Sequence, residues 1–212
     1  MTSTISFTAI DFETANEFRG SACAVGLAKV VNGTVVDEKS LLFKPPEGHQ
    51  RFDPFNTLIH GITAADVEGK PEFKEIWPDV LEYIDGDPLV AHNAAFDLGV
   101  VREALGASNM AWPDLEYLCT LVISRKAVKG LLSYSLPYVA AALDLEEFEH
   151  HQAQADARMS ALILLAIANN TKVTSLENVL ETFHVRKGTL SCDAWRGCVS
   201  RHPERSEGSK AL

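Results

Sequence analysis

The sequence predicts a fold of the α/β class, in which helices pack on a mixed β-sheet. Three apolar segments, at about 5–11, 21–31 and 34–43, predict strands, and Asn32-Gly33 between the last two is typical of a two-residue hairpin turn. After residue 88, a short apolar strand is followed by segments whose apolar residues recur at helical spacing. Strands that come first and then alternate with helices are typical of α/β or α+β domains.

The later elements are assigned from local spacing. Apolar residues within 72–84 recur every three or four positions, which predicts a helix that packs on the sheet. The apolar run 88–91 predicts a strand, and Asn93 after it can cap a helix over about 94–106. The same spacing predicts three further helices, at about 134–144, 152–169 and 175–183.

Length and composition predict one main domain. The chain has 212 residues, of which 46% are hydrophobic, and this is enough for one sizeable core. We assign residues 1–170 to this domain and residues 171–198 to a short C-terminal extension. Residues 199–212 are polar and mixed in charge, which predicts a disordered tail.

Charge and cysteine usage restrict the class of protein. Residues 1–183 carry 13 Lys and Arg against 26 Asp and Glu, which argues against a broad basic face for nucleic acid but not against an enzyme that holds metal ions. The four cysteines include no CxxC pair, the start does not resemble a signal peptide, and the longest apolar run, 161–168, is too short to cross a bilayer. We therefore expect a soluble, cytoplasmic protein.

Asp11 and Glu13 are the first candidate functional residues. They lie two positions apart in a predicted strand, so both side chains point to the same face. Adjacent carboxylates repel each other and lose hydration, so a folded protein keeps them where a cation binds between them or where the face is solvated. The pair alone favours a polar edge strand, and acids further along the chain favour a cation site.

Two more acids lie in predicted helices. Asp97 falls in the first turns of the helix at 94–106, where a lone Asp usually interacts with the helix dipole. Asp156 interrupts an otherwise apolar helix, so it must reach solvent or a partner. His151 lies about 140° from it around a continuous helix. The two can share a site only if the helix begins after His151 and the imidazole projects from the preceding loop.

Three short motifs together carry a resemblance to a known family: Asp11-x-Glu13, Asn93-x-x-x-Asp97 and His151-x-x-x-x-Asp156. In this order, over about residues 5–170, they resemble the DEDDh 3′→5′ exonucleases. Ile59–Thr63 resembles the loop that in relatives approaches the 3′ end of the substrate, and Tyr134–Ala140 resembles the helix before the last motif. The chain is most similar to bacterial homologues of the proofreading epsilon subunit of DNA polymerase III.

The resemblance implies a fold and a metal site. The fold is ribonuclease H-like, a mixed five-stranded sheet with helices on both faces. Two divalent ions, Mg²⁺ or Mn²⁺, about 3.5–4 Å apart, would bind to the acids, and Asp and Glu without Cys suit hard cations of this kind. Asp11 would bridge both ions, Glu13 and Asp156 would complete the ion that holds the attacking water, and Asp97 would support the second ion through water.

The resemblance also implies a general base and substrate contacts. His151 would take the proton from the attacking water, and its neighbour His150 is a rival that lacks the family register. His60 is equally well interpreted as a structural histidine or as a hydrogen-bonding partner of the terminal nucleotide. The remaining candidates for substrate contact adjoin the motifs: Phe12, Thr14 and Asn93. A basic cluster is interpreted first as a solvated loop and second as a contact to the substrate backbone: Arg125, Lys126 and Lys129.

The leading hypothesis is a metal-dependent 3′→5′ exonuclease with a role in proofreading or repair, which releases nucleoside 5′-monophosphates from single-stranded or frayed DNA. One alternative is an exoribonuclease that trims RNA or degrades oligoribonucleotides, because no residue settles how the 2′-OH is treated. Another is a non-catalytic subunit associated with a polymerase, although such a subunit would not need the four acids and the histidine. A DNA polymerase or sliding clamp as a partner has no support in the sequence, and no membrane partner is expected.

Overall fold

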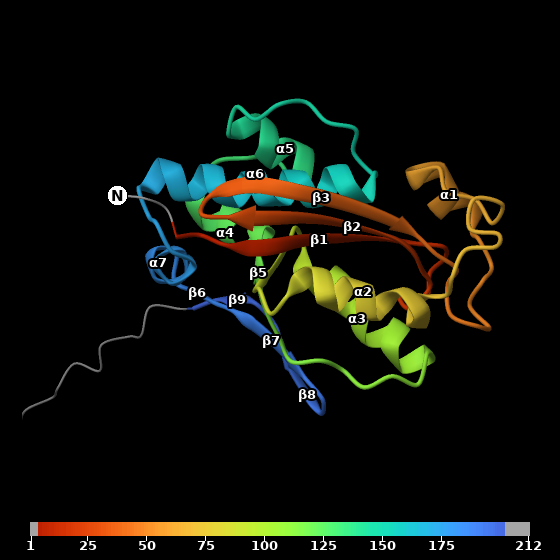
Figure 1. Ribbon diagram of the computed structural model, residues 1–212. Coiled ribbons are helices and arrows are strands. Elements are labelled where there is room, and N and C mark those ends of the chain that lie inside the picture. Colours follow the sequence, from red (N-terminus) through yellow and green to blue (C-terminus); the bar gives the residue numbers. More distant parts are fainter. Residues whose placement is uncertain (1–3, 202–212) are drawn as a thin grey trace, which may run out of the picture.

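The computed structural model describes residues 4–201, in which a seven-stranded mixed sheet has the order β3-β2-β1-β4-β5-β7-β8 (Figure 1). The first three strands form an antiparallel meander, and β4 and β5 run parallel to β1. The predicted mixed sheet is therefore confirmed. Its first five strands are β1 (Phe7–Thr14), β2 (Ala22–Val31), β3 (Thr34–Leu42), β4 (Leu89–Ala91) and β5 (Leu115–Cys119).

Helices cover both faces of this sheet (Figure 1). One face carries α2 (Phe73–Ile84) and α3 (Ala94–Ala107), which form a hydrophobic core with the sheet around Phe73 and Trp77. The other face carries a second core, in which Ile163 of the long helix α6 is fully buried. The helices of this second face are α4 (Thr120–Ala127), α5 (Leu136–Ala142) and α6 (Ala153–Thr171), with α7 (Leu176–Thr182) at its edge.

Most predicted elements are present within a few residues, but three of the elements before residue 183 were missed: α1 (Pro54–His60), β5 and α4. Helix α1 has no buried residue, so it lacks the apolar periodicity that identifies longer helices. Its ends carried a usable signal, because Asp53 caps the helix, Pro54 follows at the first helical position, and Gly61 ends it in the left-handed region.

The C-terminal extension enlarges the sheet beyond the five expected strands. A hairpin of β7 (Gly188–Ser191) and β8 (Ala194–Arg196) pairs with β5. Gly188 is required at the start of β7, because a Cβ there would lie 2.1 Å from Cζ of Tyr117. Only Leu190 of this hairpin is buried in the core that α2 and α3 form with the sheet, so the sequence shows no strand periodicity here.

Residues 199–201, the first three of the predicted tail, have a described structure, and the N–H of Arg201 donates to the carbonyl of His184 at 2.6 Å. Val199–Ser200 form β9, which pairs with β6 (Val185–Arg186) in a separate two-stranded sheet. The rest of the predicted tail, residues 202–212, lies outside the described residues. Within residues 4–201 no single helix is long and apolar enough to cross a bilayer, and α6 and α7 together pass only by length and composition, as a pair bent by 70°.

The N-terminus of α6 lies directly against β2 at Gly26. A Cβ at this glycine would come 2.0 Å from the backbone carbonyl of Ala153, the first residue of α6. Gly26 is also the register partner of Asp11 on β1. The absence of a side chain at Gly26 therefore lets the first turn of α6 approach the part of the sheet that carries Asp11.

We expect Gly26→Ala to lower the free energy of unfolding by about 1–3 kcal/mol, because the added methyl group overpacks a backbone contact that cannot move freely. Urea unfolding followed by circular dichroism measures the change. Gly106→Ala is the matched control, because a Cβ at Gly106 in α3 meets nothing within 4 Å. Helix propensity predicts that the free energy of unfolding of this control rises by up to about 1 kcal/mol. Equal stability of both variants would contradict the close packing at Gly26.

Candidate active site

Three carboxylates from two distant parts of the chain converge at the end of β1. Asp11 and Glu13 come from β1, and Asp156 comes from the first turn of α6. One oxygen atom from each of the three lies within 4.8 Å of the other two. Glu13 and Asp156 are buried, with relative exposures of 8% and 4%. The predicted convergence of these three acids is therefore present in the structure.

The fourth predicted acid, Asp97, lies beside these three. It is 1% exposed in the first turn of α3, and its Oδ1 accepts a hydrogen bond of 3.2 Å from the backbone N–H of Phe12. That bond anchors Asp97 to the residue between Asp11 and Glu13. Asp97 is outside the group of three whose oxygen atoms meet within 4.8 Å, so it approaches the site from its edge.

The acids raise one another's pKa values. Burial, followed by the charges of Asp97, Asp156 and Glu13, raises the pKa of Asp11 well above its usual range. Burial and then the charges of Asp156 and Asp97 raise the pKa of Glu13 to about 8. Burial also raises the pKa of Asp97 to about 7, although the hydrogen bond from Phe12 opposes this. Among residues 4–201, no Lys or Arg forms an ion pair with any of the four acids.

Two neighbouring histidines contact Asp156 in different ways. The imidazole Nδ1 of His150 lies 2.9 Å from Oδ2 and 3.0 Å from Oδ1 of Asp156, whereas His151 donates its backbone N–H to Oδ2 at 3.1 Å. The two rings stack with centroids 3.8 Å apart. Helix α6 begins at Ala153, so His151 precedes it on a loop, as the site requires.

His151 differs from His150 in having an imidazole that is not engaged. Among the described residues, its ring nitrogens have no hydrogen-bond partner, and its ring stacks on that of His150. Burial and then the charge of His150 lower the pKa of His151, so the ring is neutral at neutral pH and can accept a proton.

The residues predicted to contact substrate differ in which of their groups are exposed and which are already used within the protein. The side chain of Phe12 is buried in the core, and its N–H is used by Asp97. Thr14 is 7% exposed, and its carbonyl oxygen accepts hydrogen bonds from Asn56 Nδ2 at 2.9 Å and from His60 Nε2 at 3.1 Å. Asn56, which sequence reasoning did not identify, therefore helps to hold α1 against the end of β1.

The structure favours the structural interpretation of His60, and it places Asn93 at the start of α3 without a side-chain cap. Both ring nitrogens of His60 are used within the protein, because Nδ1 accepts the backbone N–H of Ile62 at 3.0 Å while Nε2 contacts Thr14. Burial lowers the pKa of His60, so it is neutral. Asn93 occupies the N-cap position of α3 as expected, but its side chain makes no capping hydrogen bond. Its φ of 66° is a left-handed conformation that Asn tolerates better than most residues, and this explains the residue type.

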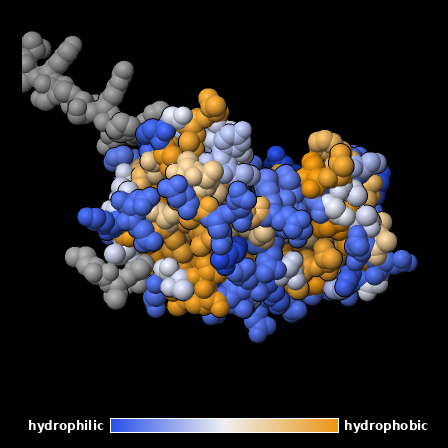
Figure 2. All heavy atoms as spheres, turned by 90° about the horizontal axis from the view of Figure 1, so that it is seen from above, coloured by the Kyte–Doolittle hydropathy of each residue, from blue (hydrophilic) through white to orange (hydrophobic). Residues whose placement is uncertain are grey.

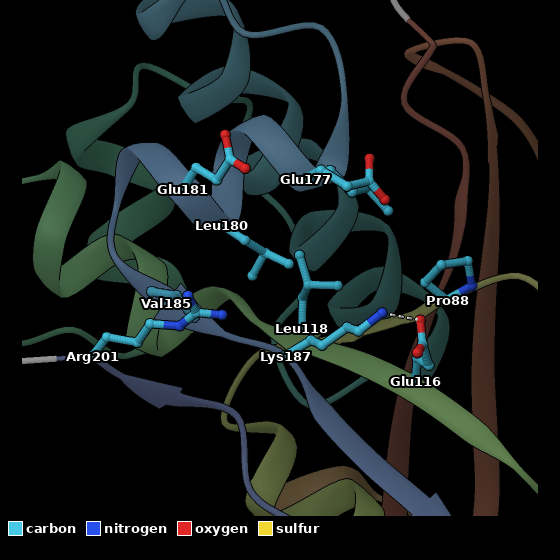
Figure 3. Close-up of a pocket in the computed structure, with 10 residues that line it drawn as sticks. Pro88, Glu116, Leu118, Glu177, Leu180, Glu181, Val185, Lys187 and Arg201 are labelled. Carbon is cyan, nitrogen blue, oxygen red and sulfur yellow. Dashed lines mark hydrogen bonds and ion pairs between the residues drawn. The ribbon is translucent and has the colours of Figure 1, made fainter.

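Another cavity, of about 220 Å³, lies at the opposite end of the strands (Figure 3). Pro88 before β4 and Glu116 at the start of β5 form one wall, and Glu177 and Glu181 of α7 lie opposite. Lys187 at its edge forms an ion pair with Glu116 at 2.6 Å. The four acids of the candidate active site are all absent from its lining, so it is a separate feature.

The chain belongs to the exonuclease family. The family model described as Exonuclease matches residues 8–164, which include all four acids and both histidines. The arrangement of four acids with a histidine before the last of them assigns it to the DEDDh type.

Curated relatives contain this domain within much longer chains. The chain is 32% identical over 186 residues to DNA polymerase III PolC-type of Thermotoga petrophila, covering 83% of this chain and 13% of that protein. It is also 32% identical over 164 residues to 3′-5′ exonuclease DinG of Bacillus subtilis, covering 76% of this chain and 17% of that protein. The chain thus spans less than a fifth of the length of these relatives.

Solved structures show the same fold. Exonuclease X in complex with 5′ overhanging duplex DNA superposes with a TM-score of 0.64 at 28% identity, covering 79% of this chain and 93% of that one. The nuclease domain of 3′hExo, a DEDDh family member bound to rAMP, superposes with a TM-score of 0.67 at 15% identity, covering 78% and 92%. The second likeness supports the fold alone.

We expect the free energy of unfolding, measured in chelator, to fall as pH rises from about 4.5 to about 8. The folded state keeps protons on Glu13 and Asp97, whose pKa values are raised to about 8 and about 7, while the unfolded state has already released them. Glu13→Gln flattens this dependence. The exposed acid Glu68 provides the control Glu68→Gln, which keeps the wild-type slope. Melting temperatures across this pH range measure the effect, and a temperature that rises with pH would contradict it.

Proposed function

We propose that this protein is a metal-dependent 3′→5′ exonuclease that hydrolyses DNA from its 3′ end and releases nucleoside 5′-monophosphates. The observation that carries the proposal is the group formed by Asp11, Glu13 and Asp156, with oxygen atoms within 4.8 Å and no Lys or Arg paired with them among residues 4–201. Burying like charges this closely is unfavourable unless protons or cations neutralise them.

The donor set fits hard divalent cations. All three groups are carboxylates, which are the ligands that Mg²⁺ and Mn²⁺ prefer, and no cysteine is among them. We propose that Asp11, Glu13 and Asp156 would hold two such ions, with Asp97 supporting them from the edge of the site. When bound, the ions would supply an activated water and neutralise charge on the phosphate in the transition state.

The histidine loop supplies the proton acceptor in this proposal. His151 is the general base, because its imidazole is neutral and has no hydrogen-bond partner among the described residues. His150 is a positioning residue, because its ring holds both oxygen atoms of Asp156. The backbone N–H of His151 also donates to Asp156, so the position of the base is linked to that of the acid.

DNA is the proposed substrate because of the relatives. The PolC-type polymerase and Exonuclease X are both at least 28% identical to this chain, and the second was solved with DNA. DNA 3′ ends are thus the proposed partner. The four cysteines are all free, which is consistent with the proposed cytoplasmic location.

The test uses 5′-labelled DNA and RNA oligonucleotides of matched sequence with Mg²⁺, Mn²⁺ or EDTA. We expect a ladder that shortens from the 3′ end of DNA faster than of RNA and that EDTA abolishes. Asp11→Asn should lower the rate at least about 100-fold, because losing a ligand removes part of the several kcal/mol that a metal contributes to the barrier. Lack of cleavage of both polymers by folded, metal-loaded protein would overturn the proposal.

The two histidines are distinguished by separate substitutions. We expect His151→Gln to lower kcat by about 10²- to 10⁴-fold and to remove the rise of kcat with pH that reports the base. His150→Gln should lower kcat less and keep that rise, because it acts only through Asp156. Steady-state kinetics from pH 5 to 9 provides the measurement. The reverse ranking, with the pH dependence lost in His150→Gln, would assign the base to His150.

A further inference from the structure

A second open space adjoins the acids on the side of α4. This cavity of about 400 Å³ is lined by residues from five segments, and its lining includes Asp11 and His150 as well as Arg125 of α4. Arg125 is the only permanently charged cation in its lining. The other lining residues are His92, Asn93, Leu121, Ser133, Tyr134, Ser135 and Leu136.

Part of the cavity wall is held in place by a chain of hydrogen bonds. His92, at the end of β4, contacts Thr120 Oγ1 through Nδ1 and the carbonyl oxygen of Tyr134 through Nε2, each at 2.8 Å. The phenol of Tyr134 donates to the carbonyl of Val128 at 2.7 Å. These bonds tie the loop of Ser133–Ser135 to both β4 and α4, so the cavity has a defined shape.

His92 itself does not supply charge to this cavity. Burial lowers the pKa of His92 to about 4, and both of its nitrogens are engaged within the protein. Arg125 is exposed, and among the described residues its guanidinium has no ion-pair or hydrogen-bond partner. The guanidinium is therefore free to bind an anion in the cavity that Asp11 also lines.

Helix α1 contacts the end of β1, close in sequence to Asp11 and Glu13. Asn56 and His60 of this helix bind the carbonyl of Thr14, and the exposed apolar residues Phe55 and Leu58 extend the same helix, 68% and 82% exposed. Figure 2 shows hydrophobic residues at the right-hand end of the molecule, where α1 lies in Figure 1. An exposed apolar surface suits contact with a base, whereas a polyanionic strand needs an open path with a cation.

We propose that Arg125 binds the phosphate immediately 5′ to the phosphate that is cleaved, and so holds the penultimate nucleotide of a single strand in this cavity. The inference rests on the proposed exonuclease function and adds to it a residue that recognises the upstream strand. About 400 Å³ is the scale of a small-ligand site, so the cavity accommodates about one nucleotide and not a duplex. Guanidinium is suited to phosphate because it donates two parallel hydrogen bonds.

The neighbouring lysines provide an internal comparison. Lys126 and Lys129 are also exposed, but neither lines the cavity, and Lys129 Nζ donates to the backbone carbonyl of Arg125 at 3.3 Å. Lys126→Gln therefore removes one positive charge from the same helix without changing the cavity. It is the matched control for Arg125→Gln, and melting temperatures verify that both variants fold.

The test compares two substrates. The first is a short single-stranded DNA, and the second is the 4-nitrophenyl ester of thymidine 5′-monophosphate, whose single phosphate is the one cleaved. We expect Arg125→Gln to lower kcat/KM for the DNA about tenfold more than for the ester, mainly through KM, because only the DNA has the upstream phosphate. Arg125→Lys should restore part of the loss, and Lys126→Gln should resemble wild type on both substrates.

A neutral methylphosphonate at the linkage next to the scissile one gives the decisive comparison. It should lower kcat/KM of the wild type about tenfold and leave Arg125→Gln little changed, because the variant has no contact left to lose. Equal losses in both proteins, or equal losses on DNA and ester in Arg125→Gln, would overturn the assignment while the exonuclease function stands. Failure of the wild type to degrade either substrate would instead overturn the proposed function, and this inference with it.

Discussion

The mutual repulsion of buried carboxylates is the constraint on which the rest of this structure depends. Asp11, Glu13 and Asp156 bring oxygen atoms within 4.8 Å of one another. The raised pKa values of Asp11 and Glu13 reflect the unfavourable free energy of burying their charges side by side. Favourable interactions elsewhere must therefore hold β1 and the first turn of α6 together against this repulsion. One such contribution comes from α6, whose apolar residues are buried with those of β1 and β2.

The fold could be predicted largely because its signals are local. The hairpin turn and the apolar periodicity of α2, α3 and α6 are properties of short windows of sequence, and these elements occur where they were predicted. Helix α1 buries nothing, and the β7–β8 hairpin depends on Gly188 fitting below the ring of Tyr117, about 70 residues earlier in the chain. Contacts between residues far apart in the sequence cannot be identified from local sequence patterns.

The candidate active site also combines features that the sequence could predict with features that it could not. The acids were predictable because carboxylates at fixed spacings in apolar elements need a common explanation, and the structure brings them together. The partners of the histidines were not predictable. The ring of His60 is occupied by Thr14 and Ile62, and the ring of His150 binds Asp156. Such contacts depend on rotamers and loop positions, on which residue type and spacing carry no information.

The hydrogen bond between Phe12 N–H and Asp97 Oδ1 has a consequence for how this site tolerates change during evolution. Asp97 is held by a backbone group, so its position does not depend on which side chain residue 12 carries. That side chain can vary among apolar residues of similar volume without disturbing the acids, and proline, which lacks the N–H, is the replacement that removes the anchor. Core packing and active-site geometry thus depend on different groups of one residue, the side chain and the backbone N–H.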